Sequence, residues 1–155
     1  MQKILLILTA VFIMSNISTK GYSQKAEFDS LRAAELGADD YGMKQYVLAF
    51  LKAGKVKSES HEKAQELQLE HLRNITKMAE EGVLVLAGPF MDDTEIRGIY
   101  IFDVKTIEEA QRLTETDPAI KAGILEMELH PWYGSAALME LTKLHGTIQK
   151  KSITD

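Results

Sequence analysis

The chain has 155 residues, a formal net charge of −5 and no cysteine. This length favours one domain, and the absent cysteines exclude disulfides, zinc–thiolate centres and cysteine nucleophiles. An acidic chain with few clustered lysines is also a poor candidate for binding nucleic acid.

The first 23 residues have the three-part pattern of a secretory signal peptide. A short positive start, Met1–Lys3, precedes the apolar run Ile4–Met14 and the small, polar stretch Ser15–Ser23. The apolar run is too short for a membrane anchor, since spanning takes about 20 residues. We therefore expect cleavage before Gln24, secretion or a periplasmic location, and no membrane attachment afterwards.

Residues 24–43 are a polar lead-in to the folded domain. Asp29 can cap a short helix over Ser30–Leu36, and Gly37 can end it. The other interpretation is a partly ordered arm.

The lead-in is followed by an alternation of strand and helix patterns, with the main domain over residues 44–133 and a helical tail over 134–155. Strands are predicted by β-branched and aromatic runs, and helices by apolar residues at helical spacing. The predicted elements are strand Lys44–Leu51, helix Glu62–Glu81, strand Val83–Ala87, strand Gly98–Val104, a helix from Thr106 to about Thr116, strand Ile124–Leu129, a turn over His130–Gly134 and helix Ala136–Gln149.

The order β-α-β-β-α-β predicts an α+β, ferredoxin-like fold, an antiparallel sheet with both helices on one face. In the third strand Ile99 and Ile101 point one way, while Tyr100 and Phe102 point the other. Two helices cover only one face, so the second apolar face needs another cover. We expect a homodimer; the alternative is that the lead-in or the C-terminal helix folds over that face.

One histidine lies where an apolar side chain is expected. On a helical projection His71 falls inside the apolar stripe of the first predicted helix, with Gln68 beside it, so both are expected to face the sheet. A buried histidine needs a hydrogen-bond partner. The simpler interpretation is a core histidine bonded to a backbone carbonyl; a carboxylate partner would suit acid/base chemistry near neutral pH.

Asp117 is the candidate partner, because it follows the second helix, which the fold places beside the first. The alternative is that Asp117-Pro118 only ends that helix. No metal or cofactor is predicted, since Gln65 stands where the His61-Glu62 start of a zinc-protease motif needs a second histidine.

Three further side chains are candidates for binding a small ligand. Arg97 lies next to the third strand and could hold an anionic group, although its position favours a surface role. Trp132 and Tyr133 follow the fourth strand and either line a cleft or close the end of the core.

Between Tyr46 and about Tyr133 the chain resembles the YCII-related domain family. The resemblance rests on His71, Gly82, Leu84, Ala87-Gly88-Pro89, Gly98, Glu108-Glu109-Ala110, Asp117-Pro118 and Gly123. It implies a ferredoxin-like fold of the dimeric α+β barrel group, with a cleft centred on a histidine and an aspartate, which match His71 and Asp117. Gly88 and Pro89 are then expected to line the ligand site. The family's substrates are mostly undefined.

These observations support two main functions. The first is an exported enzyme in which His71, oriented by Asp117, transfers protons to or from a small molecule in an isomerisation, elimination or hydrolysis. The second is a dimeric module that binds a small ligand without catalysis. A purely structural dimer is a third interpretation.

Overall fold

The computed structural model describes residues 27–154. The expected signal peptide lies outside these residues. Helix α2 (Ser30–Leu36) precedes the main domain, capped by Asp29 and ended by Gly37 in a left-handed conformation, as predicted. No helix within residues 27–154 is long and apolar enough to cross a membrane.

The main domain is an antiparallel four-stranded sheet in the order β2-β3-β1-β4. This is the ferredoxin-like β-α-β-β-α-β arrangement, and the predicted α+β fold class is confirmed. The elements of the main domain are β1 (Met43–Ala53), α3 (His61–Glu80), β2 (Leu84–Pro89), β3 (Ile96–Phe102), α4 (Ile107–Thr114), α5 (Pro118–Lys121) and β4 (Leu125–Ser135).

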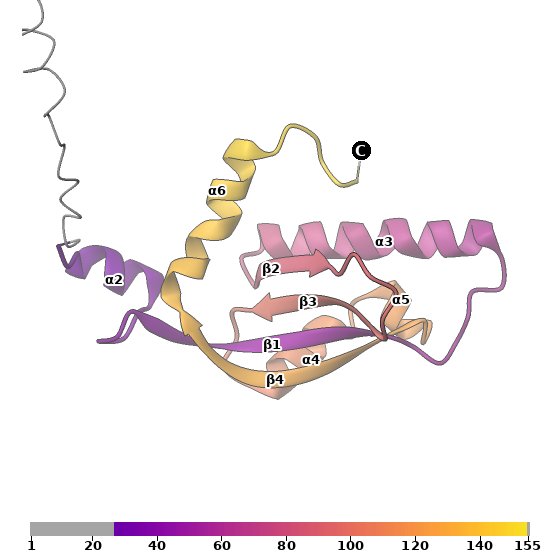
Figure 1. Cartoon of the computed structure of the whole chain (residues 1–155), viewed down its shortest axis with the longest axis horizontal. Coiled ribbons are helices and arrows are strands. Elements are labelled where there is room, and N and C mark those ends of the chain that lie inside the picture. The colour runs from indigo at the N-terminus through magenta and orange to yellow at the C-terminus, as the bar shows by residue number, and fades with distance from the viewer. Residues whose placement is uncertain (1–26, 155) are drawn as a thin grey trace, which may run out of the picture.

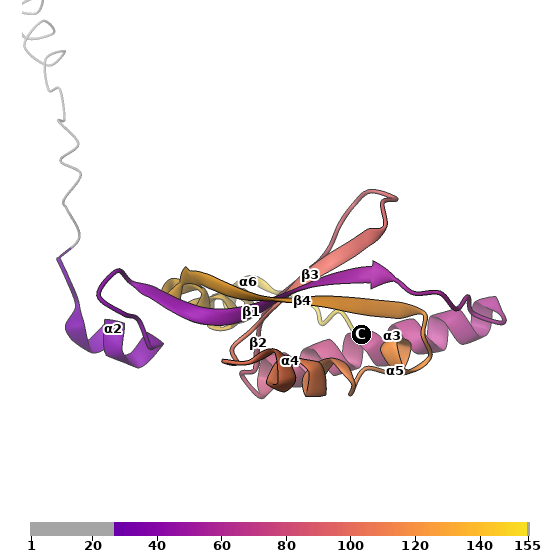
Figure 2. The same cartoon turned by 90° about the horizontal axis from the view of Figure 1, so that it is seen from below.

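Helices α3, α4 and α5 lie on the same side of the sheet (Figures 1 and 2). The core between them and the sheet contains side chains from three strands, among them Val47, Ala49, Leu84 and Phe102. Met78 packs into it from α3. The alternation predicted for the third strand is confirmed, because Tyr100 and Phe102 lie in this core whereas Ile101 belongs to a separate cluster with Tyr46 and Val85.

The prediction of a turn over His130–Gly134 is wrong. Strand β4 continues to Ser135 and pairs with β1 throughout, with Trp132 opposite Tyr46. Pro131 is compatible with this pairing because β4 is an edge strand, which needs hydrogen bonds on one side only.

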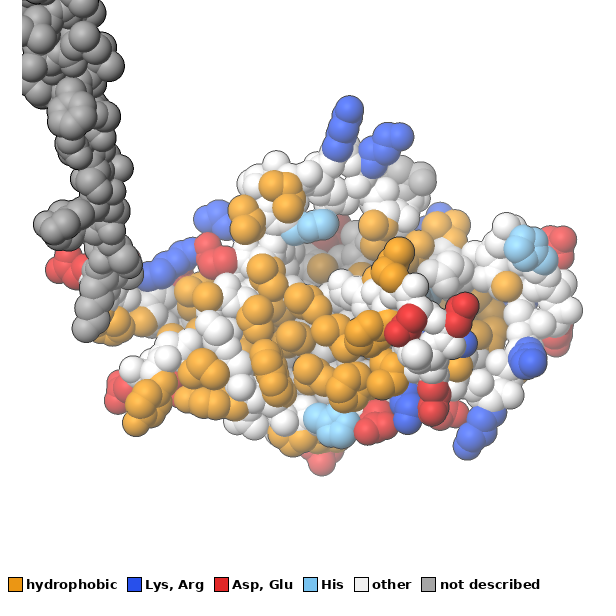
Figure 3. Space-filling view, in the orientation of Figure 1, with side chains coloured by type: hydrophobic (Ala, Val, Ile, Leu, Met, Phe, Trp, Pro, Cys, Tyr) orange, Lys and Arg blue, Asp and Glu red, His pale blue; other side chains and the backbone are white. Residues whose placement is uncertain are grey.

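The C-terminal segment covers one end of the second sheet face. It begins with the 3-10 helix η1 (Ala136–Glu140) and continues as α6 (Leu141–Ile148), where a single helix was predicted. Leu138 and Met139 pack against the cluster of Tyr46, Val85 and Ile101. Apolar side chains gather over the strands on this face (Figure 3).

Candidate functional site

His71 lies inside the fold, on the face of α3 that packs against the sheet. It is 5% exposed, and the only other fully buried residue of α3 is Met78, two turns further on. The helix begins at a side-chain cap, with Ser60 accepting from the backbone N–H of Lys63. The sequence pattern placed this histidine correctly.

Asp117 lies between α4 and α5 and contacts His71 of α3. His71 Nδ1 and Asp117 Oδ2 are 2.6 Å apart, and Asp117 is fully buried. The other carboxylate oxygen accepts from the backbone N–H of Ala119 at 2.8 Å, which makes Asp117 the N-cap of α5. The end of α4 is tied to α3 by Asn74, whose Nδ2 donates to Thr116 Oγ1 at 2.9 Å. Asp117 is therefore held in place by its hydrogen bond to the backbone of α5 and by the Asn74–Thr116 hydrogen bond next to it.

Tyr100 completes the cluster, and the sequence analysis did not identify it. Its hydroxyl lies 3.3 Å from His71 Nε2, and the two rings are stacked with centroids 6.3 Å apart. Tyr100 is only 2% exposed, and this burial, followed by the nearby negative charge of Asp117, raises the pKa of its phenol. The phenol therefore stays protonated over the whole physiological pH range.

The three groups fix each other's hydrogen-bonding roles. A carboxylate only accepts hydrogen bonds, so Nδ1 of a neutral His71 ring carries the proton and donates it to Asp117. Nε2 then keeps its lone pair and accepts from the hydroxyl of Tyr100. An imidazole held in this way by a buried carboxylate has the geometry that a general base requires.

The remaining predicted ligand-binding residues are spread over the domain. Gln68 is exposed, and the expectation that it faces the sheet is wrong: at roughly 100° per residue it lies about 60° around α3 from His71, which puts it at the solvent edge of the stripe. Gly88 and Pro89 are the last two residues of β2. They directly follow Ala87, which pairs with Tyr100 on β3. Arg97 is exposed and lies at an irregularity of β3, between Ile96 and Gly98, which pair with Lys52 and Leu51 of β1.

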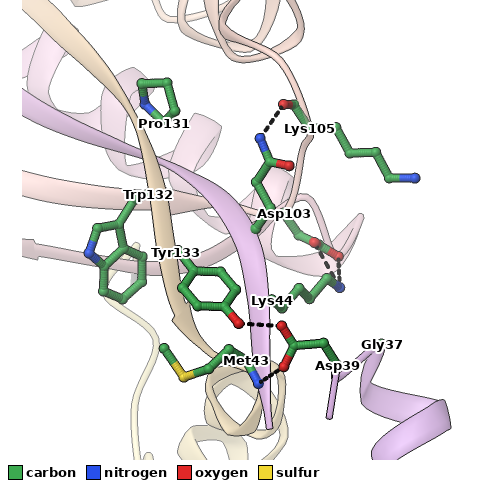
Figure 4. Close-up of a pocket in the computed structure, with 10 residues that line it drawn as sticks. Gly37, Asp39, Met43, Lys44, Asp103, Lys105, Pro131, Trp132 and Tyr133 are labelled. Atoms are coloured by element: carbon green, nitrogen blue, oxygen red, sulfur yellow. Dashed lines mark hydrogen bonds and ion pairs between the residues drawn. The ribbon is translucent and has the colours of Figure 1, made fainter. Parts of the chain in front are cut away.

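Trp132 and Tyr133 do not join His71. Leu129 is opposite Ala49, the strand partner of Tyr100, so Tyr133 lies about 13 Å further along β4, four residues at roughly 3.3 Å each. Both aromatic residues line an open groove of about 800 Å3 between the lead-in and the loop after β3 (Figure 4). There the hydroxyl of Tyr133 donates to Asp39, which raises the pKa of Tyr133 and lowers that of Asp39.

Other polar groups in this groove are paired with each other. Lys44 Nζ lies 2.8 Å from Asp103 Oδ1, and Gln45 Nε2 donates to the carbonyl of Lys105 at 3.2 Å. In the part of the chain that the structure describes, no three His, Asp or Glu side chains come close enough together to hold a metal ion.

One family model matches the segment that contains the sheet and the cluster. The family model of the YCII-related domain matches residues 46–133, which include His71, Tyr100 and Asp117. No curated protein matches the chain significantly. The matched segment covers more than half of the chain and contains the entire sheet apart from the first three and the last two paired residues. The chain therefore belongs to the YCII-related domain family.

Proposed function

We propose that this domain transfers protons to or from a small molecule, with His71 as the general base or acid and Asp117 as the residue that orients it. The observation that carries the proposal is the buried 2.6 Å contact between His71 Nδ1 and Asp117 Oδ2. Isomerisation, elimination and hydrolysis all begin with such a transfer, and a positioned acid/base group contributes about 10²–10⁴-fold to a rate.

The carboxylate supports this role in two ways. It selects the ring form in which Nε2 holds the lone pair, and it stabilises the imidazolium that forms once Nε2 takes a proton. Asp117 keeps its place without His71, because it also caps α5. A group fixed in this way does not have to reorganise during the reaction.

Deuterium transfer tests the proposal without a known substrate. The protein is incubated in heavy water with the small-molecule extract of its native host, and mass spectrometry follows every compound. We expect His71-dependent mass changes, since isomerisation places solvent deuterons on carbon, elimination removes the mass of the leaving group and its proton, and hydrolysis adds heavy water. His71→Asn should abolish these changes, because asparagine keeps a donor near Asp117 but is not a base.

The control is His130→Asn, since His130 lies on the surface and bonds to Glu128 instead. The proposal would be contradicted if the extract showed the same mass changes with wild type and with His71→Asn.

The second candidate is a ligand-binding module without catalysis. The observation in its favour is that His71 is only 5% exposed and that both ring nitrogens already have partners within the chain. A compound from the same extract that stays bound in native mass spectrometry, with its own mass unchanged, would favour this function.

We also infer that the mature protein is secreted or periplasmic. The support is the signal-peptide pattern of residues 1–23. N-terminal sequencing of the protein from its host identifies the cleavage point.

A further inference from the structure

Tyr100 and His71 form a donor–acceptor pair that is complementary to one class of organic molecule. The phenol hydroxyl is a donor, Nε2 is an acceptor, and they are 3.3 Å apart. This contact is longer than the 2.6 Å contact on the other side of the ring, so it is the weaker of the two hydrogen bonds. A ligand that offers an acceptor next to an acidic proton can replace it and satisfy both groups at once.

We propose that Tyr100 is a second catalytic residue, which binds the carbonyl oxygen of a small neutral ketone or aldehyde while His71 Nε2 removes a proton from the adjacent carbon. This inference rests on the proposed function and names the substrate class of the same site.

The proton and electron balance of the step is simple. The C–H bond next to the carbonyl breaks, its proton forms a bond with Nε2, and its electron pair forms a C=C bond. The carbonyl π electrons move onto oxygen, where the developing negative charge accepts a hydrogen bond from Tyr100. Asp117 stabilises the resulting imidazolium. Return of a proton from Nε2 to the same carbon gives exchange, and delivery to another carbon gives an isomer.

The surroundings of Tyr100 suit a hydrogen-bond donor of this kind. Burial raises the pKa of the phenol, so the proton that it donates is retained. The strand partners of Tyr100 are Ala49 and Ala87, which place only methyl groups beside the ring on the two neighbouring strands. Met78 and other apolar side chains enclose the site next to the buried carboxylate of Asp117, which favours a neutral substrate over an anionic one.

Acetone and cyclohexanone are the probes for this inference. Each is incubated with the protein in heavy water, and proton NMR follows the loss of the signal from the carbons next to the carbonyl. We expect wild type to exchange at least one probe faster than buffer and faster than His71→Asn. Tyr100→Phe should lower the enzymatic rate by about 100-fold, the usual effect of removing one donor to a developing oxyanion.

Tyr46→Phe is the matched control. Tyr46 is also a buried phenol on the sheet, but its hydroxyl donates to the carbonyl of Ser135 at 3.1 Å, in the cluster on the other face. The Tyr46→Phe variant should exchange the probe at the wild-type rate. Thermal unfolding should show that Tyr46→Phe and Tyr100→Phe are both folded.

The outcomes separate this inference from the proposed function. Exchange that depends on His71 but not on Tyr100 overturns the role of Tyr100 and leaves the proton transfer standing. The absence of exchange of both ketones, combined with His71-dependent mass changes in the extract, overturns the carbonyl substrate class alone. Exchange that persists in His71→Asn overturns both.

Discussion

The two oxygens of Asp117 are occupied by different parts of the fold. Oδ1 accepts from the backbone of Ala119 and Oδ2 faces His71 Nδ1. An asparagine at this position must keep its oxygen toward Ala119, because a backbone N–H needs an acceptor, and so must turn its NH2 group toward His71. The amide would then donate to Nδ1 and force the ring into the other neutral form. The backbone of α5 thus determines which nitrogen of His71 is basic.

At this scale the sequence predicts the pair but not the third member of the cluster. His71 is recognisable because it interrupts an apolar stripe, and Asp117 because a proline follows it. Tyr100 also carries a usable signal: it points to the same face as Phe102 in an otherwise aliphatic strand, and a buried phenol needs a hydrogen-bond partner. Its partner is not recognisable from sequence alone, because it depends on how α3 packs across the sheet.

Among the elements, β4 shows where local sequence signals mislead. Pro131 and Gly134 are typical of a turn, yet both belong to an edge strand. Gly134 is required by the neighbouring side chain, since a Cβ there would lie 2.2 Å from the ring of Trp132. That ring in turn packs against Tyr46 at a centroid distance of 5.8 Å. The other strands and helices α2, α3 and α4 agree with the sequence prediction to within a few residues. The short helix α5 is not predicted from the sequence, because Asp117-Pro118 is interpreted there only as the end of the preceding helix.

Gly134→Ala tests this account of β4. The added methyl group should displace Trp132 and destabilise the domain by about 1–3 kcal/mol, the range typical of overpacking. Trp132 is the single tryptophan of the chain, so its fluorescence should change as well. Gly88→Ala is the control, because a Cβ at Gly88 meets nothing within 4 Å. Equal denaturation midpoints and emission spectra for Gly134→Ala and wild type would contradict the packing argument.

On the scale of the whole molecule, the second face of the sheet remains only partly covered. Leu48, Phe50 and Ile99 are half-buried there, beyond the end covered by η1. The rim of this face is polar, with Lys52 Nζ 3.0 Å from Glu128 Oε2. A half-buried apolar centre with a polar rim is typical of a surface that pairs with a second copy. We propose that the protein is a homodimer through this face.

Sedimentation of residues 24–155 tests the dimer. At micromolar concentration we expect about twice the monomer mass, and Phe50→Lys should give a folded monomer because it places a charge in the apolar centre. A wild-type monomer under the same conditions would show that η1 and α6 are a sufficient cover for this face.

Heteronuclear NMR of the His71 ring nitrogens tests the central claim most directly, namely that Asp117 makes Nε2 the basic atom. In the neutral ring of wild type we expect the proton on Nδ1 and the lone pair on Nε2. In Asp117→Asn the two assignments should exchange, with the proton on Nε2, where it can be donated to the oxygen of Tyr100. A wild-type ring protonated on Nε2, or a ring that is the same in both proteins, would contradict the orientation of His71 by Asp117.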